Sequence, residues 1–110
     1  MFSMVGRFRF RSFSDAEQQS LMQRIEQDAV PIIRESPGFR DVRFVVRAAD
    51  NELMTVWLWD SEADWDAALA RLGPFIQENF APHLAQPPER LGGSVATQVT
   101  PPEVAAQPGS

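Results

Sequence analysis

Apolar and polar positions alternate at the start of the chain, over residues 2–11. The apolar parity consists of Phe2, Met4, Gly6, Phe8 and Phe10. The other parity consists of Ser3, Val5, Arg7, Arg9 and Arg11. A period of two residues over this length predicts a β-strand with one apolar face.

A helical period replaces the alternation after Ser14. Ser14 followed three residues later by Glu17 matches a capping box, which marks a helix N-terminus. The apolar residues that recur at helical spacing are Leu21, Met22, Ile25, Ala29, Ile32 and Ile33. This stripe predicts an amphipathic helix. Pro31 lies inside it and is expected to kink or interrupt the last turns. The segment "ESPGF" predicts the turn that ends the helix.

Two further strands are predicted at residues 39–48 and 52–60. Asp50 and Asn51 in the segment between them tolerate turn conformations, so the two strands are expected to form an antiparallel hairpin. In the second strand one face holds Leu53, Thr55, Trp57 and Trp59, and the other holds Met54, Val56 and Leu58. Both faces of this strand are therefore largely apolar.

A second helix is predicted to begin at Ser61, with Asp64 as its capping-box acid. Its apolar face holds Trp65, Ala68, Leu69 and Leu72. The pair Gly73-Pro74 is expected to break this helix, and residues 74–85 to resume it. Residues 86–93, "QPPERLGG", are predicted as a loop, and residues 94–100, "SVATQVT", as a weak fourth strand. Residues 101–110 have the composition of a disordered tail.

The predicted order is strand, helix, strand, strand, helix, strand. This order is typical of the α+β ferredoxin-like fold with an antiparallel sheet, here one domain over residues 1–100 followed by the tail at 101–110. Helices cover one face of such a sheet, and the strand at 52–60 is apolar on both faces. We therefore expect a second copy of the chain to cover the open face as a homodimer, the alternative being a monomer with an apolar central strand.

Composition narrows the possible partners and cofactors. The net charge of -5 disfavours a nucleic-acid partner, which needs a basic surface. There is no cysteine, so neither disulfides nor thiolate chemistry is available. The first residues match neither a secretory signal nor a membrane span, so a cytoplasmic protein without a membrane partner is expected. The single histidine, His83, has no carboxylate at ligand spacing, so no metal site is expected.

All three tryptophans lie within residues 57–65. Trp57 and Trp59 share a strand face with Thr55, and Trp65 on the helical stripe could meet them. Large aromatic rings fill cores, but they also line ligand pockets, so both interpretations stay open. A packed interior between Trp59, Trp65 and Phe80 favours a core. An open volume with Thr55 or His83 pointing inward favours a ligand site.

Arginines recur on one face of the strands at residues 2–11 and 39–48. They are Arg7, Arg9 and Arg11 on the first and Arg43 and Arg47 on the second. Such a stripe either binds an anionic ligand or pairs with Asp and Glu side chains. On the first strand the aromatic residues alternate with the arginines and therefore lie on the opposite face, which does not suit RNA binding.

Two motifs connect this pattern with a known family. The turn Pro37-Gly38-Phe39 after the first helix and the sequence Trp59-Asp60-Ser61 before the second resemble the antibiotic biosynthesis monooxygenase-like group of dimeric α/β barrel proteins. The resemblance covers nearly all of residues 1–100. It implies a homodimer of two ferredoxin-like units, with a pocket between the sheet and the helices of each.

The resemblance also implies site residues. Oxygenases of this group act on polyphenolic or quinone-forming compounds without metal or flavin, so no cofactor is expected. They hold the substrate with a tryptophan near the end of the third strand, which matches Trp59, and with an aromatic residue early in the next helix, which matches Trp65. The amide side chain four residues before the tryptophan matches Thr55, which offers a single hydroxyl instead.

Haem-degrading members of the group use an asparagine on the first strand, a tryptophan in the second helix and a histidine further along. Trp65 matches the tryptophan, whereas Gly6 or Arg7 stands where the asparagine is expected. His83 lies too far along the chain to match the histidine. Haem degradation is therefore the weaker expectation.

The sequence thus leads to two hypotheses. The first is a dimer that binds a small hydrophobic aromatic compound at Thr55, Trp57, Trp59, Trp65, Phe80 and His83. If it is catalytic, it is a cofactor-independent monooxygenase in which the substrate itself, as a phenolate or enolate, reacts with oxygen. The second is a non-catalytic dimeric module whose aromatic residues form its core.

Overall fold

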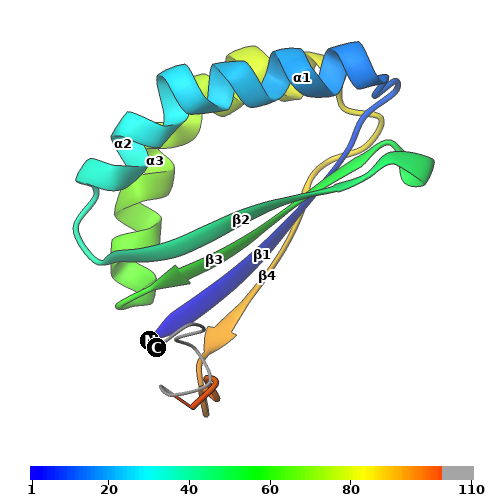
Figure 1. Cartoon of the computed structure of the whole chain (residues 1–110). Coiled ribbons are helices and arrows are strands. Elements are labelled where there is room, and N and C mark those ends of the chain that lie inside the picture. Colours follow the sequence, from blue (N-terminus) through cyan, green and yellow to red (C-terminus); the bar gives the residue numbers. More distant parts are fainter. Residues whose placement is uncertain (103–110) are drawn as a thin grey trace, which may run out of the picture.

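The computed structural model describes residues 1–102, in which three main helices arch over one face of a four-stranded sheet (Figure 1). The strands are β1 (Phe2–Arg9), β2 (Phe39–Arg47), β3 (Glu52–Trp59) and β4 (Glu89–Ser94). The helices are α1 (Asp15–Arg24), the π-helix η1 (Ile25–Ala29), α2 (Val30–Glu35) and α3 (Glu62–Asn79). Short 3-10 turns are η2 (Ala48–Asp50) and η3 (Ala81–His83). The disordered tail predicted at 101–110 lies outside the described residues from position 103 onward.

The sheet is antiparallel throughout, with the strand order β2-β3-β1-β4. With α1 to α2 following β1 and α3 following β3, this arrangement confirms the predicted α+β ferredoxin-like fold. Both central strands, β1 and β3, place alternate side chains in the core under the helices. No helix within residues 1–102 is long and apolar enough to cross a membrane.

The two motifs that carry the family resemblance contact each other. Gly38 has a φ of 80°, a conformation that favours glycine, and its carbonyl accepts a hydrogen bond of 2.8 Å from the amide of Asp60. The rings of Phe39 and Trp59 meet edge to face, with centroids 5.4 Å apart. The turn after α2 therefore holds the end of β3 in place, and with it the start of α3.

The first helix begins as predicted but is irregular in its middle. Ser14 and Glu17 form the complete capping box. The chain then passes through the π-helical turn η1 before Pro31, and the helix continues to Glu35. Pro31 sits in the first turn of α2, where its missing N–H costs least, so the local widening comes before the proline and the last turns are kept.

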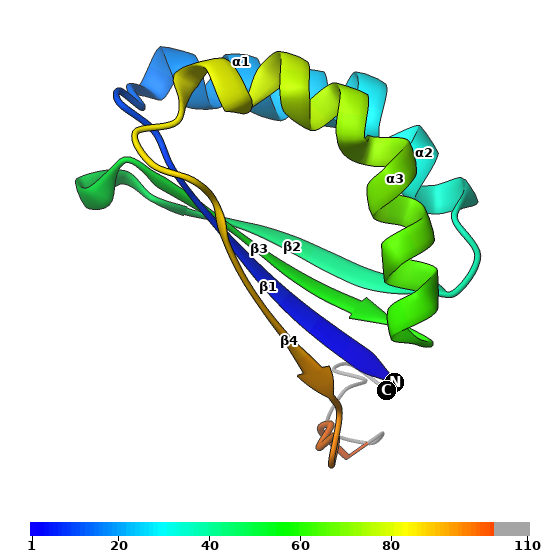
Figure 2. The same ribbon diagram turned by 180° about the vertical axis from the view of Figure 1, so that it is seen from behind.

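The expected break at Gly73-Pro74 was wrong. Helix α3 continues through both residues to Asn79, although Figure 2 shows that it bends along its length. Proline removes one backbone hydrogen bond and crowds the preceding turn, which bends a helix. Leu72 and Phe75 on either side of the pair are buried, so packing against the core keeps the segment helical.

The position of the fourth strand was also predicted wrongly. The segment "ERLGGS" forms β4, whereas residues 95–100 have no regular structure. Two glycines give this segment poor strand propensity, and it is ordered by pairing with β1. A side chain at Gly92 would collide with the core ring of Phe2, because an added Cβ would lie 2.5 Å from Cζ. Gly92 thus lowers the strand propensity of this segment, and yet the packing of β4 against Phe2 requires a glycine there.

The arginines on the other face of the sheet pair with acids. Glu52, only 1% exposed, accepts hydrogen bonds from Arg7 at 2.7 Å and from Arg47 at 3.4 Å, and Arg9 lies 3.6 Å away. The Arg7 hydrogen bond lowers the pKa of Glu52 below its ordinary value, in spite of burial, which acts in the opposite direction. Of the two predicted roles of the arginines, pairing with acids is confirmed for these three.

Candidate functional site

Four residues form a row across the helix-facing side of the sheet, one from each strand. Phe44 of β2 pairs with Thr55 of β3, Thr55 pairs with Gly6 of β1, and Gly6 pairs with Arg90 of β4. The row begins with an aromatic ring, passes a hydroxyl and a residue without a side chain, and ends on a guanidinium. Backbone pairing alone sets this order, because residues opposite one another in antiparallel strands point to the same face.

Gly6 makes a depression in the middle of this row. A Cβ atom added at Gly6 would lie 2.7 Å from Thr55 Oγ1 and 3.4 Å from the ring of Phe8, closer to the oxygen than real Cβ atoms approach. Glycine therefore leaves the space above β1 open and keeps the Thr55 hydroxyl uncovered from that side. The depression exists because glycine has no side chain.

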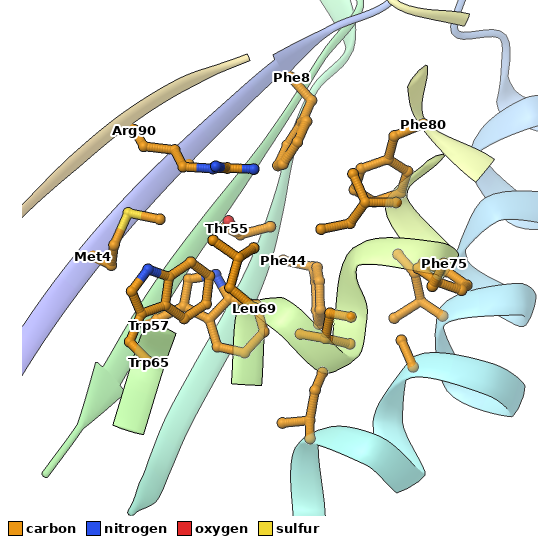
Figure 3. A pocket seen from close by; sticks show the side chains of 16 residues that line it. Met4, Phe8, Phe44, Thr55, Trp57, Trp65, Leu69, Phe75, Phe80 and Arg90 are labelled. Atoms are coloured by element: carbon orange, nitrogen blue, oxygen red, sulfur yellow. The ribbon is translucent and has the colours of Figure 1, made fainter. Parts of the chain in front are cut away.

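The row is the floor of a cavity between the sheet and the helices, which we call the inner pocket (Figure 3). From the sheet it is lined by Met4, Gly6, Phe8, Phe44, Thr55, Trp57 and Arg90. From the helices it is lined by Ile25, Ala29, Ile33, Trp65, Leu69, Leu72, Phe75, Ile76 and Phe80. Its volume is about 40 Å³. A cavity of about 150 Å³ is needed to hold benzene, so a ligand of one ring or more requires the walls to move.

The three tryptophans pack together, with ring centroids between 5.1 and 6.0 Å apart. Trp57 and Trp65 line the inner pocket. Trp59 is fully buried behind them, is not part of the lining, and its indole Nε1 has no hydrogen-bond partner within residues 1–102. The cluster thus serves as both core and pocket wall, with a different role for each ring.

The remaining predicted site residues divide between two places. Phe80 lines the inner pocket, where its ring meets Phe8 edge to face at 4.7 Å. His83 is exposed and lies in a separate depression with Glu17, near the start of α1. There the Ser12 hydroxyl and the Ser14 amide donate hydrogen bonds that lower the pKa of Glu17. Thr55, Trp57, Trp65 and Phe80 are brought together, whereas Trp59 and His83 lie outside the cavity.

Arg90 is the site residue that sequence reasoning missed. Figure 3 shows its side chain extended over the pocket between Met4 and Phe8, on the same side as the Thr55 hydroxyl. Because "QPPERLGG" was predicted as a loop, Arg90 had no assigned face. Its pairing opposite Gly6 places Arg90 on the pocket side of the sheet. This pairing can be inferred only once the position of β4 is known.

The electrostatics of the inner pocket are simple. Arg90 is the single ionisable side chain among the residues that line it, and Thr55 carries the single hydroxyl. Arg90 is exposed on the edge strand β4, where its guanidinium can donate charge-assisted hydrogen bonds to an anion at the border of the pocket. Apart from this guanidinium and the Thr55 hydroxyl, the lining is apolar. Within residues 1–102, no three His, Cys, Asp or Glu side chains are grouped so as to hold a metal ion.

The fold is shared with several proteins of known structure. No protein-family model and no curated protein matches the sequence. The monooxygenase ActVA-Orf6 of Streptomyces coelicolor, solved with nanaomycin D, superposes with a TM-score of 0.73 at 20% identity over 92% of both chains. SnoaB of Streptomyces nogalater, a cofactor-independent oxygenase, gives a TM-score of 0.67 at 18% identity over 89% of this chain and 95% of its own.

A third similar structure is a variant of MhuD with two manganese protoporphyrin IX molecules bound per active site. Its TM-score is 0.64 at 19% identity, over 92% of this chain and 100% of its own. At these identities the likenesses establish the fold. They confirm, at that level, the resemblance to the antibiotic biosynthesis monooxygenase-like group.

Proposed function

We propose that this protein binds a small aromatic compound with an acidic phenol or enol oxygen in the inner pocket and oxidises it with molecular oxygen, without a cofactor. The observation that carries the proposal is the row of Phe44, Thr55, Gly6 and Arg90 on the pocket floor. A planar ligand above Thr55 and Gly6 would place its ring beside Phe44 and Trp57, and its anionic oxygen against Arg90. The fold shared with two oxygenases supports this choice of chemistry.

The chemistry follows from what the pocket contains. No carboxylate or imidazole lines it, so the proton must leave to water, and Arg90 favours this step by stabilising the resulting anion. The electron-rich anion then reduces oxygen, and a carbon–oxygen bond forms to give a hydroperoxide. For an anthrone-type substrate, loss of water converts the CH₂ carbon to a carbonyl. One oxygen atom enters the product and the other leaves as water. The apolar walls exclude solvent from the intermediates.

A non-catalytic binding or structural module of the same fold is the second candidate. The small volume of the inner pocket, about 40 Å³, favours it, because such a space holds no aromatic ring unless the walls move. Haem is a poorer match, since the single histidine of the chain, His83, lies outside the inner pocket. We also propose that the protein acts as a homodimer, for which the half-buried apolar residues on the other face of β3 are the support.

The test combines tryptophan fluorescence with dissolved oxygen. Trp57 and Trp65 line the pocket, so dihydroxyanthrone should quench their emission saturably, with one oxygen molecule consumed for each quinone formed. Quenching without oxygen uptake would identify a binding protein. If dihydroxyanthrone, hydroquinone and haem all fail to quench, the pocket is core and the proposal is wrong.

Arg90→Gln should weaken binding of the anionic ligand by about tenfold or more, because the charge-assisted hydrogen bonds are lost. The expected decrease grows with pH, since only the ionised ligand uses the charge. Titration at several pH values measures it. Arg11→Gln, an exposed arginine outside the inner pocket, is the matched control and should leave the dissociation constant unchanged. Equal losses in both variants would show that Arg90 contributes only general surface charge.

A further inference from the structure

A larger hollow lies beside the inner pocket, on the side of β2. We call it the outer groove. Its floor includes Met22, Val30, Phe39 and Val42, which are all apolar and half-buried. Its volume is about 630 Å³. Small-molecule sites commonly span about 300–1,000 Å³, so the groove has the capacity that the inner pocket lacks.

The inner pocket and the outer groove share a wall. Ile25, Ile33 and Phe44 line both. The two isoleucines belong to the helical segments and are each 2% exposed, so the surrounding core holds them. Phe44 is half-buried and stands on β2, an edge strand of the sheet with a neighbouring strand on one side only. Of the three shared residues, Phe44 is therefore the one that can turn at the least cost.

The contacts of Phe44 agree with such a motion. Its ring meets Trp57 edge to face with centroids 6.2 Å apart, at the long end of aromatic contact distances. It begins the row that ends on Arg90, so its displacement would extend the inner pocket along the direction in which a ligand lies. Rotamer changes of partly exposed rings are fast compared with enzymatic turnover.

We propose that the outer groove is a second part of the binding site, which takes the far end of an elongated, fused-ring ligand, and that Phe44 is the movable partition between the two parts. The inference rests on the proposed function, because it assumes a ligand with its acidic edge at Arg90. The ligand class is then a polycyclic aromatic acid or enol with polar substituents at the far end. Glu26, Arg34, Arg40 and Asp41 at the groove supply charges of both signs for such substituents.

Two variants separate the partition from the groove, with hydroquinone as a one-ring probe and dihydroxyanthrone as a three-ring probe. Phe44→Ala should raise the association rate constant of both probes by about tenfold, because the ring no longer blocks the entrance for most of the time. Val46→Ala, on the helix-facing side of the same strand but outside both cavities, should change neither. Stopped-flow tryptophan quenching measures the rates. Equal rates in Phe44→Ala and Val46→Ala would show that Phe44 is not a partition.

Val42→Trp tests the groove separately, since Val42 lines the outer groove but not the inner pocket. It should weaken dihydroxyanthrone by about tenfold and change hydroquinone binding by less than about twofold. If the tryptophan affects both probes equally, or neither, the groove is not part of the site. If hydroquinone and dihydroxyanthrone both fail to bind the unmodified protein, the proposed function itself fails, and this inference fails with it.

Discussion

At the scale of single residues, the site depends on what a position lacks as much as on what it carries. Gly6 opens the pocket floor, Thr55 supplies a hydroxyl where the resemblance to the oxygenases implies an amide, and Arg90 supplies the charge. A hydroxyl can donate only one hydrogen bond, so the guanidinium must provide most of the stabilisation of an anionic ligand. Under the proposed function, this division favours acidic ligands that ionise readily.

Gly6→Ala should lower ligand affinity at least about tenfold, because the new methyl group fills the depression and turns the Thr55 hydroxyl away. Since the added Cβ would lie 2.7 Å from Thr55 Oγ1, a loss of about 1–3 kcal/mol in the free energy of unfolding is also expected. Fluorescence titration and urea denaturation measure the two effects.

Gly93→Ala is the matched control for this prediction. Gly93 lies on β4, and a Cβ added there meets no atom within 4 Å. It should alter neither affinity nor stability beyond about 0.5 kcal/mol. Unchanged ligand binding in Gly6→Ala would show that the depression is not where the ligand lies.

At the scale of elements, ion pairs between side chains join the strands in addition to the backbone hydrogen bonds of the sheet. Glu52 of β3 connects to Arg7 and Arg9 of β1 and to Arg47 of β2, so one buried carboxylate links three strands at one end of the sheet. These arginine side chains are 38–46% exposed, whereas that of Glu52 is 1% exposed. Removing the acid would leave three cations close together, which is costlier than removing any one arginine.

Glu52→Gln should lower the free energy of unfolding by about 3 kcal/mol near neutral pH. The folded-state pKa of Glu52 is depressed, so its contribution is fully present above the ordinary value of 4.5 and is lost as the pH falls through the lower folded-state value. The difference in unfolding free energy between the variant and the unmodified protein should therefore shrink as the pH falls below 4.5. Urea denaturation over a pH series measures it.

Glu89→Gln provides the comparison for an exposed pair. Glu89 lies 3.2 Å from Arg7 but is 53% exposed, so its loss should cost no more than about 0.5 kcal/mol. A pH-independent difference for Glu52→Gln would mean that packing of its side chain, and not its charge, stabilises the sheet.

At the scale of the whole molecule, the helices cover one face of the sheet and leave the other open (Figure 1). Apolar side chains lie on that open face, with Met54, Val56 and Leu58 half-buried along β3. Leu91 of β4 is 72% exposed and Val45 of β2 is 41% exposed. Exposed apolar surface spanning several strands is typical of an interface, and a second copy offers the same surface in return.

Leu58→Glu should convert the expected dimer to a monomer. The new carboxylate would lie opposite Asp41 of β2 and Ser3 of β1, neither of which is a cation, so it would lose its hydration in the interface without gaining an ion-pair partner there. Sedimentation velocity measures the mass. Ala67→Glu, on the exposed side of α3, adds the same charge away from the open face and should leave the mass unchanged. A monomeric unmodified protein at micromolar concentration would contradict the prediction.

Much of this architecture is determined by the sequence alone, because its signals are local. The alternation in residues 2–11, the capping box at Ser14 and the serine cap at Ser61 each depend on neighbours within a few positions, and all three occur. Strand β1 ends at Arg9, however, and at the second helix the Asp64 carboxylate accepts a hydrogen bond from the Ser61 hydroxyl, so the predicted capping box is incomplete. The turn at Gly38 belongs with these local signals. These elements in this order are enough to specify the ferredoxin-like fold.

Tertiary structure decided what depends on contacts between distant segments. Packing keeps α3 helical through Gly73-Pro74, and pairing with β1 makes a strand of the glycine-rich segment that contains Arg90. The resemblance to the monooxygenase-like group pointed to Thr55 and Trp65, and strong local patterns placed both on known faces. Arg90 could not be placed in this way, since its face is set by the register of a strand 84 positions from Gly6 in the sequence. The sequence supplies the chemical groups of the pocket, but the pairing of the strands in the sheet brings them together.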